Sequence, residues 1–323
     1  MEHPDEEAEA KGWQLNVAHR YFKSFRHFRG DEEEKERLER KTEVINWQHS
    51  LDLTLLRQFN NRWSLSVGVP LLANKRSSLY EHGRTERHNT GSAGISDARI
   101  TAYRWLLSPQ KATKGNLQLG LGAKLPTGNY TAKDTFYNVG PDGAPEERPV
   151  DQSIQLGDGG FGAITELNGF YSLGSHVSAY GNVYYLFNPR GDNGTRTFRS
   201  RANEAIMSVA DQYMVRVGVN HSFVGKLQGL TASLGGRMEG VPVEDAIGSS
   251  KGFRRPGYVQ SLEPGFSYQV KKVNFFATAP VALKRNRLQS VTDKENTILT
   301  GTYVHGDAAF ADHALNIGCT IKL

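Results

Sequence analysis

Residues 116–125, Asn-Leu-Gln-Leu-Gly-Leu-Gly-Ala-Lys-Leu, decide the fold, because apolar residues alternate in them with polar residues and glycine. A period of two places successive side chains on opposite faces of a β-strand, so one face is apolar and the other is not. The same alternation runs through residues 63–71 and again through residues 315–323. It recurs roughly twelve times along the chain, and the connections between these segments are alternately short and long.

An even number of strands, each apolar on one face only, is typical of a transmembrane β-barrel. We therefore predict an all-β protein, a transmembrane antiparallel up-and-down β-barrel of about 12 strands, in a bacterial outer membrane. Residues 12–323 would form the barrel, and residues 1–11 an acidic, flexible N-terminal tail. The chain begins without the apolar segment of a signal peptide, so we interpret it as a mature chain from which that peptide is missing.

The composition fits such a barrel and argues against several other classes of protein. Mean hydropathy is −0.52, and the longest uncharged apolar stretches, such as residues 67–73, are far shorter than a membrane helix of about 20 residues. The 34 glycines, 13 tyrosines and 15 phenylalanines suit barrel bends and aromatic girdles. The single cysteine, Cys319, excludes an internal disulfide. The net charge of +5 is scattered without a basic stripe, so nucleic acid is not an expected partner.

The connections predict how the barrel is oriented. Both termini fall on the side of the short turns, as in bacterial outer-membrane barrels, so the long loops are expected to be extracellular. Aromatic residues gather at both ends of the predicted strands and leave an aliphatic band between them. The long loops are predicted at residues 74–94, 127–157, 188–204, 241–256 and 284–306.

Three short motifs resemble one family of outer-membrane transporters. They are Gly-Ile-Ser-Asp-Ala-Arg at residues 94–99, Leu-Gly-Leu-Gly-Ala-Lys-Leu-Pro-Thr-Gly at 119–128, and Leu-Gly-Asp-Gly-Gly at 156–160. Together they are similar to the family named for the MetA pathway of phenol degradation, over about residues 45–323. The resemblance implies an outer-membrane barrel that moves small, often aromatic or apolar compounds. The chain departs from many such barrels by ending on Leu323 rather than on an aromatic residue.

Charges of both signs lie on the polar parity of the strands, where they would face the lumen. They suggest an internal ladder of ion pairs with little net field. Such charges either neutralise one another and narrow the pore, or form a constriction that selects the solute, and both roles can hold together. The bases are Arg20, Arg99, Lys124, Arg216, Arg237 and Lys284, and the acids are Asp52, Asp97, Glu166, Glu239 and Glu263.

The loop predicted at residues 127–157 is the longest, and loops of such length are usually functional or disordered. It carries Tyr130, Phe136 and Tyr137, which could fold inward as a stacking surface for an aromatic solute. The alternative is a disordered surface loop. We therefore predict that this loop and the lumen charges beneath it select the solute.

Histidine residues suggest two kinds of chemistry, and the sequence favours neither. His19, His49 and His313 share the apolar parity of neighbouring strands, so a transition-metal site is conceivable. Polar residues tolerated near the membrane interface are the simpler interpretation, and no metal is predicted. His49 and Ser50 are adjacent, so they point to opposite faces of a strand and cannot act as base and nucleophile. We expect neither an enzyme nor a cofactor.

These patterns predict passive, selective diffusion of a small molecule past a charged constriction. About twelve strands leave a lumen wider than a filled eight-stranded barrel and narrower than a general porin. The first alternative is a plugged barrel that acts as a binding or structural protein through its extracellular loops. The second is a soluble all-β protein. The expected partners are outer-membrane lipid and a small solute, and neither the identity of the solute nor the oligomeric state follows from the sequence.

Overall fold

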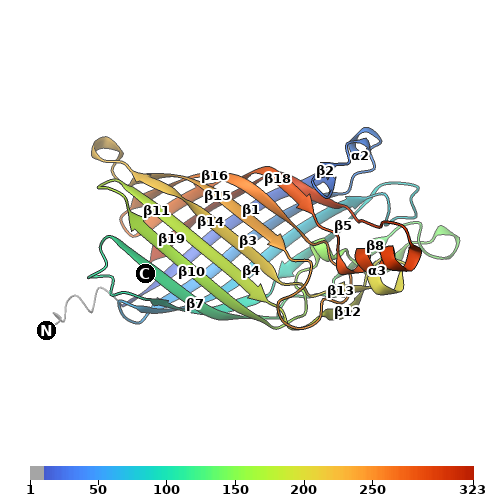
Figure 1. Ribbon diagram of the computed structural model, residues 1–323, viewed down its shortest axis with the longest axis horizontal. Coiled ribbons are helices and arrows are strands. Elements are labelled where there is room, and N and C mark those ends of the chain that lie inside the picture. Colours follow the sequence, from blue (N-terminus) through green and yellow to red (C-terminus); the bar gives the residue numbers. More distant parts are fainter. Residues whose placement is uncertain (1–10) are drawn as a thin grey trace.

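The computed structural model describes residues 11–323, which form a closed antiparallel β-barrel of twelve strands (Figure 1). The chain runs up and down around the wall, and its last strand, β19 (Ala308–Lys322), pairs with its first, β1 (Gly12–Arg29). The predicted fold class is therefore confirmed. The acidic tail expected over residues 1–11 lies, apart from Lys11, outside the described residues.

The wall is built almost entirely by pairing between strands that follow one another in the sequence. In order, it consists of β1, β3 (Ile45–Gln58), β4 (Trp63–Ser78), β6 (Ala98–Trp105), β7 (Gly115–Leu125), β10 (Gly162–Ser172), β11 (Val177–Phe187), β14 (Gln212–Ser222), β15 (Leu230–Val241), β16 (Gly257–Val270), the pair β17 (Val273–Thr278) and β18 (Val281–Arg287), and β19. β17 and β18 share one place in the wall. The break between them contains Pro280, which lacks an N–H for the ladder.

The alternation of the sequence places apolar side chains on the outside. Val217 and Leu121 point outward and are 58% and 56% exposed. Glu263 and Lys124 lie on the other face of the wall and are 1% and 2% exposed. An outer face of this kind suits lipid rather than water. No helix among residues 11–323 is long and apolar enough to cross a membrane.

Two of the long loops are shorter than predicted, because the strands continue beyond their alternating part. β4 runs to Ser78 and pairs with β5 (His88–Ile95), so only residues 79–87 separate them, where the sequence predicted a loop over 74–94. β18 likewise continues into the predicted loop 284–306. Both faces of these extensions carry polar residues, so the hydrophobic period that marks a strand is missing there.

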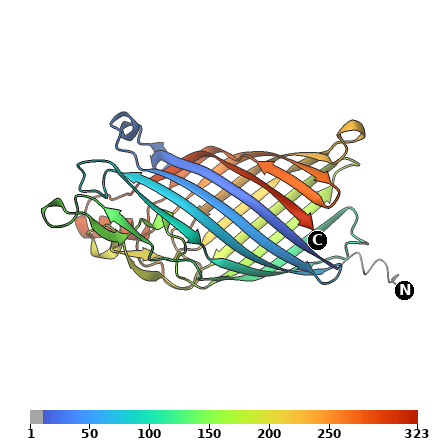
Figure 2. The ribbon, with the colours of Figure 1, turned by 180° about the vertical axis from the view of Figure 1, so that it is seen from behind.

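The connections at one end of the barrel fold on one another into a cap (Figures 1 and 2). Phe253 N–H donates to Ile206 O, and Asn203 Nδ2 donates to Asn296 Oδ1, so loops far apart in the sequence are joined. The opposite end carries short turns, one of which contains η4 (Gly225–Leu227). The cap contains β2 (Glu32–Glu33), α2 (Glu36–Glu39), β8 (Lys133–Phe136), η1 (Pro141–Gly143), β9 (Glu146–Pro149), η2 (Gln152–Ile154), β12 (Asp192–Arg196), η3 (Ala202–Glu204), β13 (Ile206–Ser208) and α3 (Val291–Thr300).

Candidate functional site

A chain of ion pairs crosses the lumen from β1 to β14, and we call its five residues the lumen chain. It joins Arg20, Glu239, Arg237, Glu263 and Arg216 in that order. Arg20 Nη2 lies 3.2 Å from Glu239 Oε1, although β19, β18 and β16 separate β1 from β15 in the wall. Arg237 lies 2.5 Å from Glu239 and 3.2 Å from Glu263, which also binds Arg216. These side chains therefore point inward and span part of the pore.

A second group lies on the inner face of β6, β10 and β11. Tyr103 donates its hydroxyl to Glu166 Oε2 at 3.1 Å, and the guanidinium of Arg99 lies 5.8 Å from the centre of the Tyr184 ring. Gly120, on β7 between them, makes room, since a Cβ there would lie 2.7 Å from Tyr103 Cε1. Tyrosine ring faces and charged groups thus line the same part of the lumen.

A third group joins the wall to the cap. Lys124 binds Asp158 and lies 3.9 Å from Asp97. The carboxylate of Asp97 in turn accepts the N–H groups of Gly128 at 3.0 Å and Asp158 at 3.1 Å. The buried Lys124 ammonium is therefore neutralised by two carboxylates, one of which also fixes the ends of the longest loop.

The structure brings most of the predicted lumen residues together, but it leaves three without an ion pair. Within residues 11–323, Asp52, Arg99 and Glu166 have no opposite charge within 4.0 Å. Asp52 accepts a hydrogen bond from Ser50 Oγ at 3.0 Å instead. Lys284, which the sequence also assigned to the lumen, pairs with Asp31 at 3.4 Å beside the cap.

Part of the loop between β7 and β10 enters the mouth of the barrel. Gln48 Nε2 donates to Ser153 O at 2.6 Å, and Asn74 Nδ2 and Ser92 Oγ both donate to Ile154 O. Gln48, Asn74 and Ser92 stand on the inner face of the wall, so η2 lies inside it. The mouth is therefore narrowed by the loop that the sequence singled out.

Asp151, at the start of η2, is held by arginines from two other parts of the chain. Its Oδ2 lies 2.7 Å from Arg255 and 3.5 Å from Arg76. Burial alone would raise the pKa of the Asp151 carboxyl, but Arg255 and Arg76 outweigh burial and hold that pKa well below its ordinary value. Arg76 also binds Glu81 at 2.6 Å. No periodic pattern in the sequence pointed to these residues, because all of them lie at or beyond the strand ends.

The same arginines border a cavity of about 240 Å³ inside the cap. Burial and the neighbouring Arg255 lower the pKa of Arg199, whose guanidinium lies 3.8 Å from the centre of the Phe253 ring. The positive side chains at this cavity outnumber the negative ones. They are Arg37, Arg76, Arg84, Arg199 and Arg255, against Glu81 and Asp307.

The three aromatic residues predicted as a stacking surface lie in different surroundings. Phe136 is buried and stacks on His82 at 5.4 Å, whereas Tyr137 stacks on His88 at 4.3 Å. Tyr130 packs against Gly159, with Arg190 5.9 Å from the centre of its ring. Phe136 is thus part of the packing of the cap, and the three rings do not share one face.

Two groups of side chains contain residue types that bind metals, one on the outer wall and one, His27 with Glu34 and Asp307, in the cap. His19 Nε2 lies 3.2 Å from His49 Nδ1 on the outer wall, but Ile317, four residues beyond His313, stands opposite His19. In the cap, His27 Nδ1 lies 2.5 Å from Asp307, and His27 Nε2 accepts the Val44 N–H at 2.8 Å. Both ring nitrogens of His27 are engaged, so neither cluster is assigned a metal.

Comparison with known proteins supports the fold. No family model matches the chain, and no curated protein sequence matches it significantly, so membership of the MetA-pathway family stays a prediction. The structure is similar to that of the COG4313 outer membrane channel from Pseudomonas putida F1, with a TM-score of 0.61 at 13% identity over all of both chains. A FadL homologue from Pseudomonas aeruginosa gives a TM-score of 0.46 at 10% identity, over 97% of this chain and 90% of that one. The Pseudomonas putida toluene transporter TodX gives 0.45 at 8% identity, over 96% and 89%. At 13% identity, the likeness to the COG4313 channel shows a shared barrel fold.

Proposed function

We propose that this protein is a channel of the bacterial outer membrane through which a small molecule diffuses passively and selectively. The observation that carries the proposal is the lumen chain, which runs from Arg20 on one part of the wall to Arg216 on another. A solute that passes must exchange contacts with these fixed charges, and such a constriction is what makes a pore selective. The apolar outer wall and the likeness to an outer membrane channel support the location.

The lining of the lumen bears on the class of solute. The lumen chain has three arginines and two glutamates, so its net charge is positive. Tyr103 and Tyr184 add ring faces beside the charges. An aromatic or apolar solute of the kind that the family resemblance implies could stack on the rings, and a polar substituent on it could meet the arginines.

The cap is the second part of the proposed selector. η2 narrows the mouth and is held through Asp151, so passage requires that η2 move or that the solute fit beside it. Loops that close and open a site in this way are common among functional loops. The ion pairs that hold the cap also favour a second candidate function, a closed barrel that binds a partner through its loops.

Conductance and uptake distinguish the two candidates. Purified protein in planar bilayers should conduct, and proteoliposomes should take up some members of a panel of aromatics, sugars and organic acids and reject others. A matched variant replaces Lys133–Pro149 by two glycines, because Val150 N–H and Ala132 O are already 2.9 Å apart. It removes the hairpin β8–β9 and keeps η2. We expect larger conductance and weaker solute preference, with the barrel still folded by heat-modifiable migration. A wild type and variant that both fail to conduct would favour the closed barrel.

A further inference from the structure

Side chains on the outer wall of β1, β3 and β4 are ordered by height towards the cap. Cross-strand partners form an aliphatic row of Val17, Leu53 and Val69, and in the row above it His19 stands beside Leu51 and Leu71. The next row towards the cap contains Tyr21 and His49. The row after that is Lys23, Trp47 and Lys75, because Trp47 stands directly opposite both lysines. The sequence of rows is therefore aliphatic, aromatic and cationic, which is the order expected from the acyl chains of a membrane to its headgroups.

The two lysines of the upper row share one indole ring. Lys23 Nζ lies 5.8 Å and Lys75 Nζ 5.7 Å from the centre of the Trp47 ring. Lys23 also lies 4.8 Å from the centre of the Phe25 ring. Among residues 11–323, no carboxylate lies within 4.0 Å of either lysine, so aromatic rings hold two positive charges that no acid neutralises.

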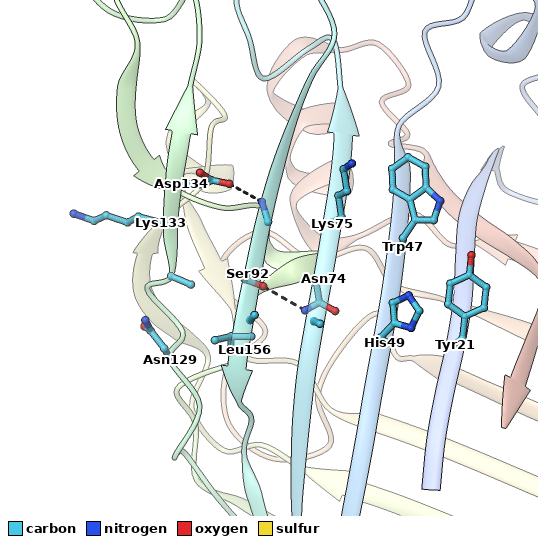
Figure 3. Close-up of a pocket in the computed structure, with 14 residues that line it drawn as sticks. Tyr21, Trp47, His49, Asn74, Lys75, Ser92, Asn129, Lys133, Asp134 and Leu156 are labelled. Carbon is cyan, nitrogen blue, oxygen red and sulfur yellow. Dashed lines mark hydrogen bonds between the residues drawn. The ribbon is translucent and has the colours of Figure 1, made fainter. Parts of the chain in front are cut away.

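A hollow of about 1040 Å³ opens beside this row, between the edge of β5 and β8 (Figure 3). Tyr21, His49, Trp47 and Lys75 stand along one side of it, and Lys133 stands on the other. The acid in the hollow is Asp134, and its oxygens are engaged. Its Oδ2 accepts the Gly91 N–H at 2.7 Å and its Oδ1 accepts the Thr135 N–H at 2.7 Å. Lysines therefore dominate the free charge of the hollow.

We propose that this hollow binds the phosphorylated headgroup of a glycolipid in the outer leaflet of the membrane. Lys75, with Lys23 beside it across Trp47, contacts one phosphate, Lys133 on the other side of the hollow contacts the second, and the rings of Tyr21 and Trp47 pack against the sugar. The aromatic row continues downward into the aliphatic band, so the acyl chains of the same molecule lie along the wall. A free phosphate ion would use the lysines alone and leave the aromatic row uncovered. The inference rests on the outer-membrane location proposed above.

The test uses the purified barrel in neutral detergent micelles and lipid A with both phosphates as the probe. Binding is followed by native mass spectrometry and by tryptophan fluorescence. The test variant is K23Q/K75Q/K133Q. The matched control, K226Q/K271Q/K272Q, loses the same charge at the short-turn end of the barrel. We expect the test variant to bind lipid A at least about tenfold more weakly than the wild type, and the control to bind as the wild type does.

Three outcomes would overturn the proposal: equal binding by the two triple variants, equal binding of dephosphorylated lipid A, or full competition by millimolar inorganic phosphate. The last would indicate a simple anion site. Heat-modifiable migration checks that each variant is folded. Planar-bilayer conductance of K23Q/K75Q, which leaves the hairpin β8–β9 unchanged, should match the wild type, because both lysines stand beside Trp47 on the outer wall. A barrel that binds lipid A but does not conduct would refute the proposed channel and leave the lipid site standing.

Discussion

Replacing both glutamates of the lumen chain by glutamine, E239Q/E263Q, tests whether these charges control permeation. The substitutions keep the shapes of the side chains and leave Arg20, Arg216 and Arg237 unneutralised, so the chain gains two positive charges. At about 8 Å from a passing ion, each added charge is worth about 0.5 kcal/mol in water and about 2 kcal/mol at an effective dielectric near 20. We therefore expect the anion to be favoured by at least about 1 kcal/mol, a factor of about five.

The measurement is the reversal potential in planar bilayers under a salt gradient, with the lower concentration near 0.1 M so that screening does not hide the effect. Glu263 is 1% exposed and binds two arginines, so its loss also costs about 3–5 kcal/mol of stability. E239Q alone spares Glu263, and it provides a milder variant if the double one does not fold.

The control, E244Q/E295Q, removes two exposed carboxylates at the cap end of the barrel, one from a loop and one from α3, and changes the net charge equally. The reasoning is refuted if the folded lumen variant keeps the wild-type reversal potential, or if the control shifts it as much.

Three further predictions concern the cap and the lining of the lumen. D151N removes the carboxylate that Arg76 and Arg255 share, so single-channel conductance should rise. The pKa of Asp151 is depressed in the folded protein. The ionised Asp151 therefore stabilises the cap fully above the ordinary carboxyl pKa, and that stabilisation is lost only as pH falls through the pKa of the folded state. Wild-type conductance should therefore not rise between about pH 7 and about pH 4. Burial and the neighbouring His88 lower the pKa of His82 to about 4. Neutral His82 therefore stabilises the hairpin β8–β9 fully above the ordinary histidine pKa of about 6.5, and this stabilisation of the hairpin is lost as pH falls from there through about 4. Limited proteolysis of the hairpin should accelerate from about pH 7.5 to about pH 4.5 in the wild type and not in H82Q, and equal acceleration in both would contradict this assignment. G120A should push Tyr103 away from Glu166, destabilise the barrel by about 1–3 kcal/mol in urea titration and lower solute flux, whereas G236A, in open space, should do neither.

The wall of the barrel could be predicted from the sequence because one physical rule governs all of it. Lipid outside and polar groups inside impose a period of two, and residues 116–125 already show it. The same rule predicts which residues face the lumen, and Arg20, Lys124 and Glu263 do lie on the inner face, whereas Lys284 pairs with Asp31 beside the cap. It also placed His19 and His49 on the same face of adjacent strands, and the register between the strands, which the sequence left open, brings the two rings together.

The pairing partners could not be predicted, because they depend on the stagger between strands and on the reach of side chains across the pore. Nothing in the sequence relates Arg20 to Glu239, which is 219 residues away. The contacts within the cap could not be predicted from the sequence for a different reason. Asp151 and Arg255 come from loops without any periodic pattern, and their contact depends on how two loops fold over the mouth. His313 fell outside the pair of histidines because the register places Ile317 opposite His19.

The seam between β1 and β19 bears on the biogenesis of the protein. The register joins Gln14 to Lys322 at one end and Phe28 to Ala308 at the other. The free edge of β1, the first strand to be synthesised, can therefore be paired only when β19, the last strand, is complete. Until then, β1 and β17 each present an edge of unpaired N–H and C=O groups, which hydrocarbon cannot satisfy. A stop codon ahead of residue 308 would therefore yield no narrower pore but a sheet with two open sides. The barrel can therefore reside stably in the bilayer only once the fifteen residues of β19 have been added.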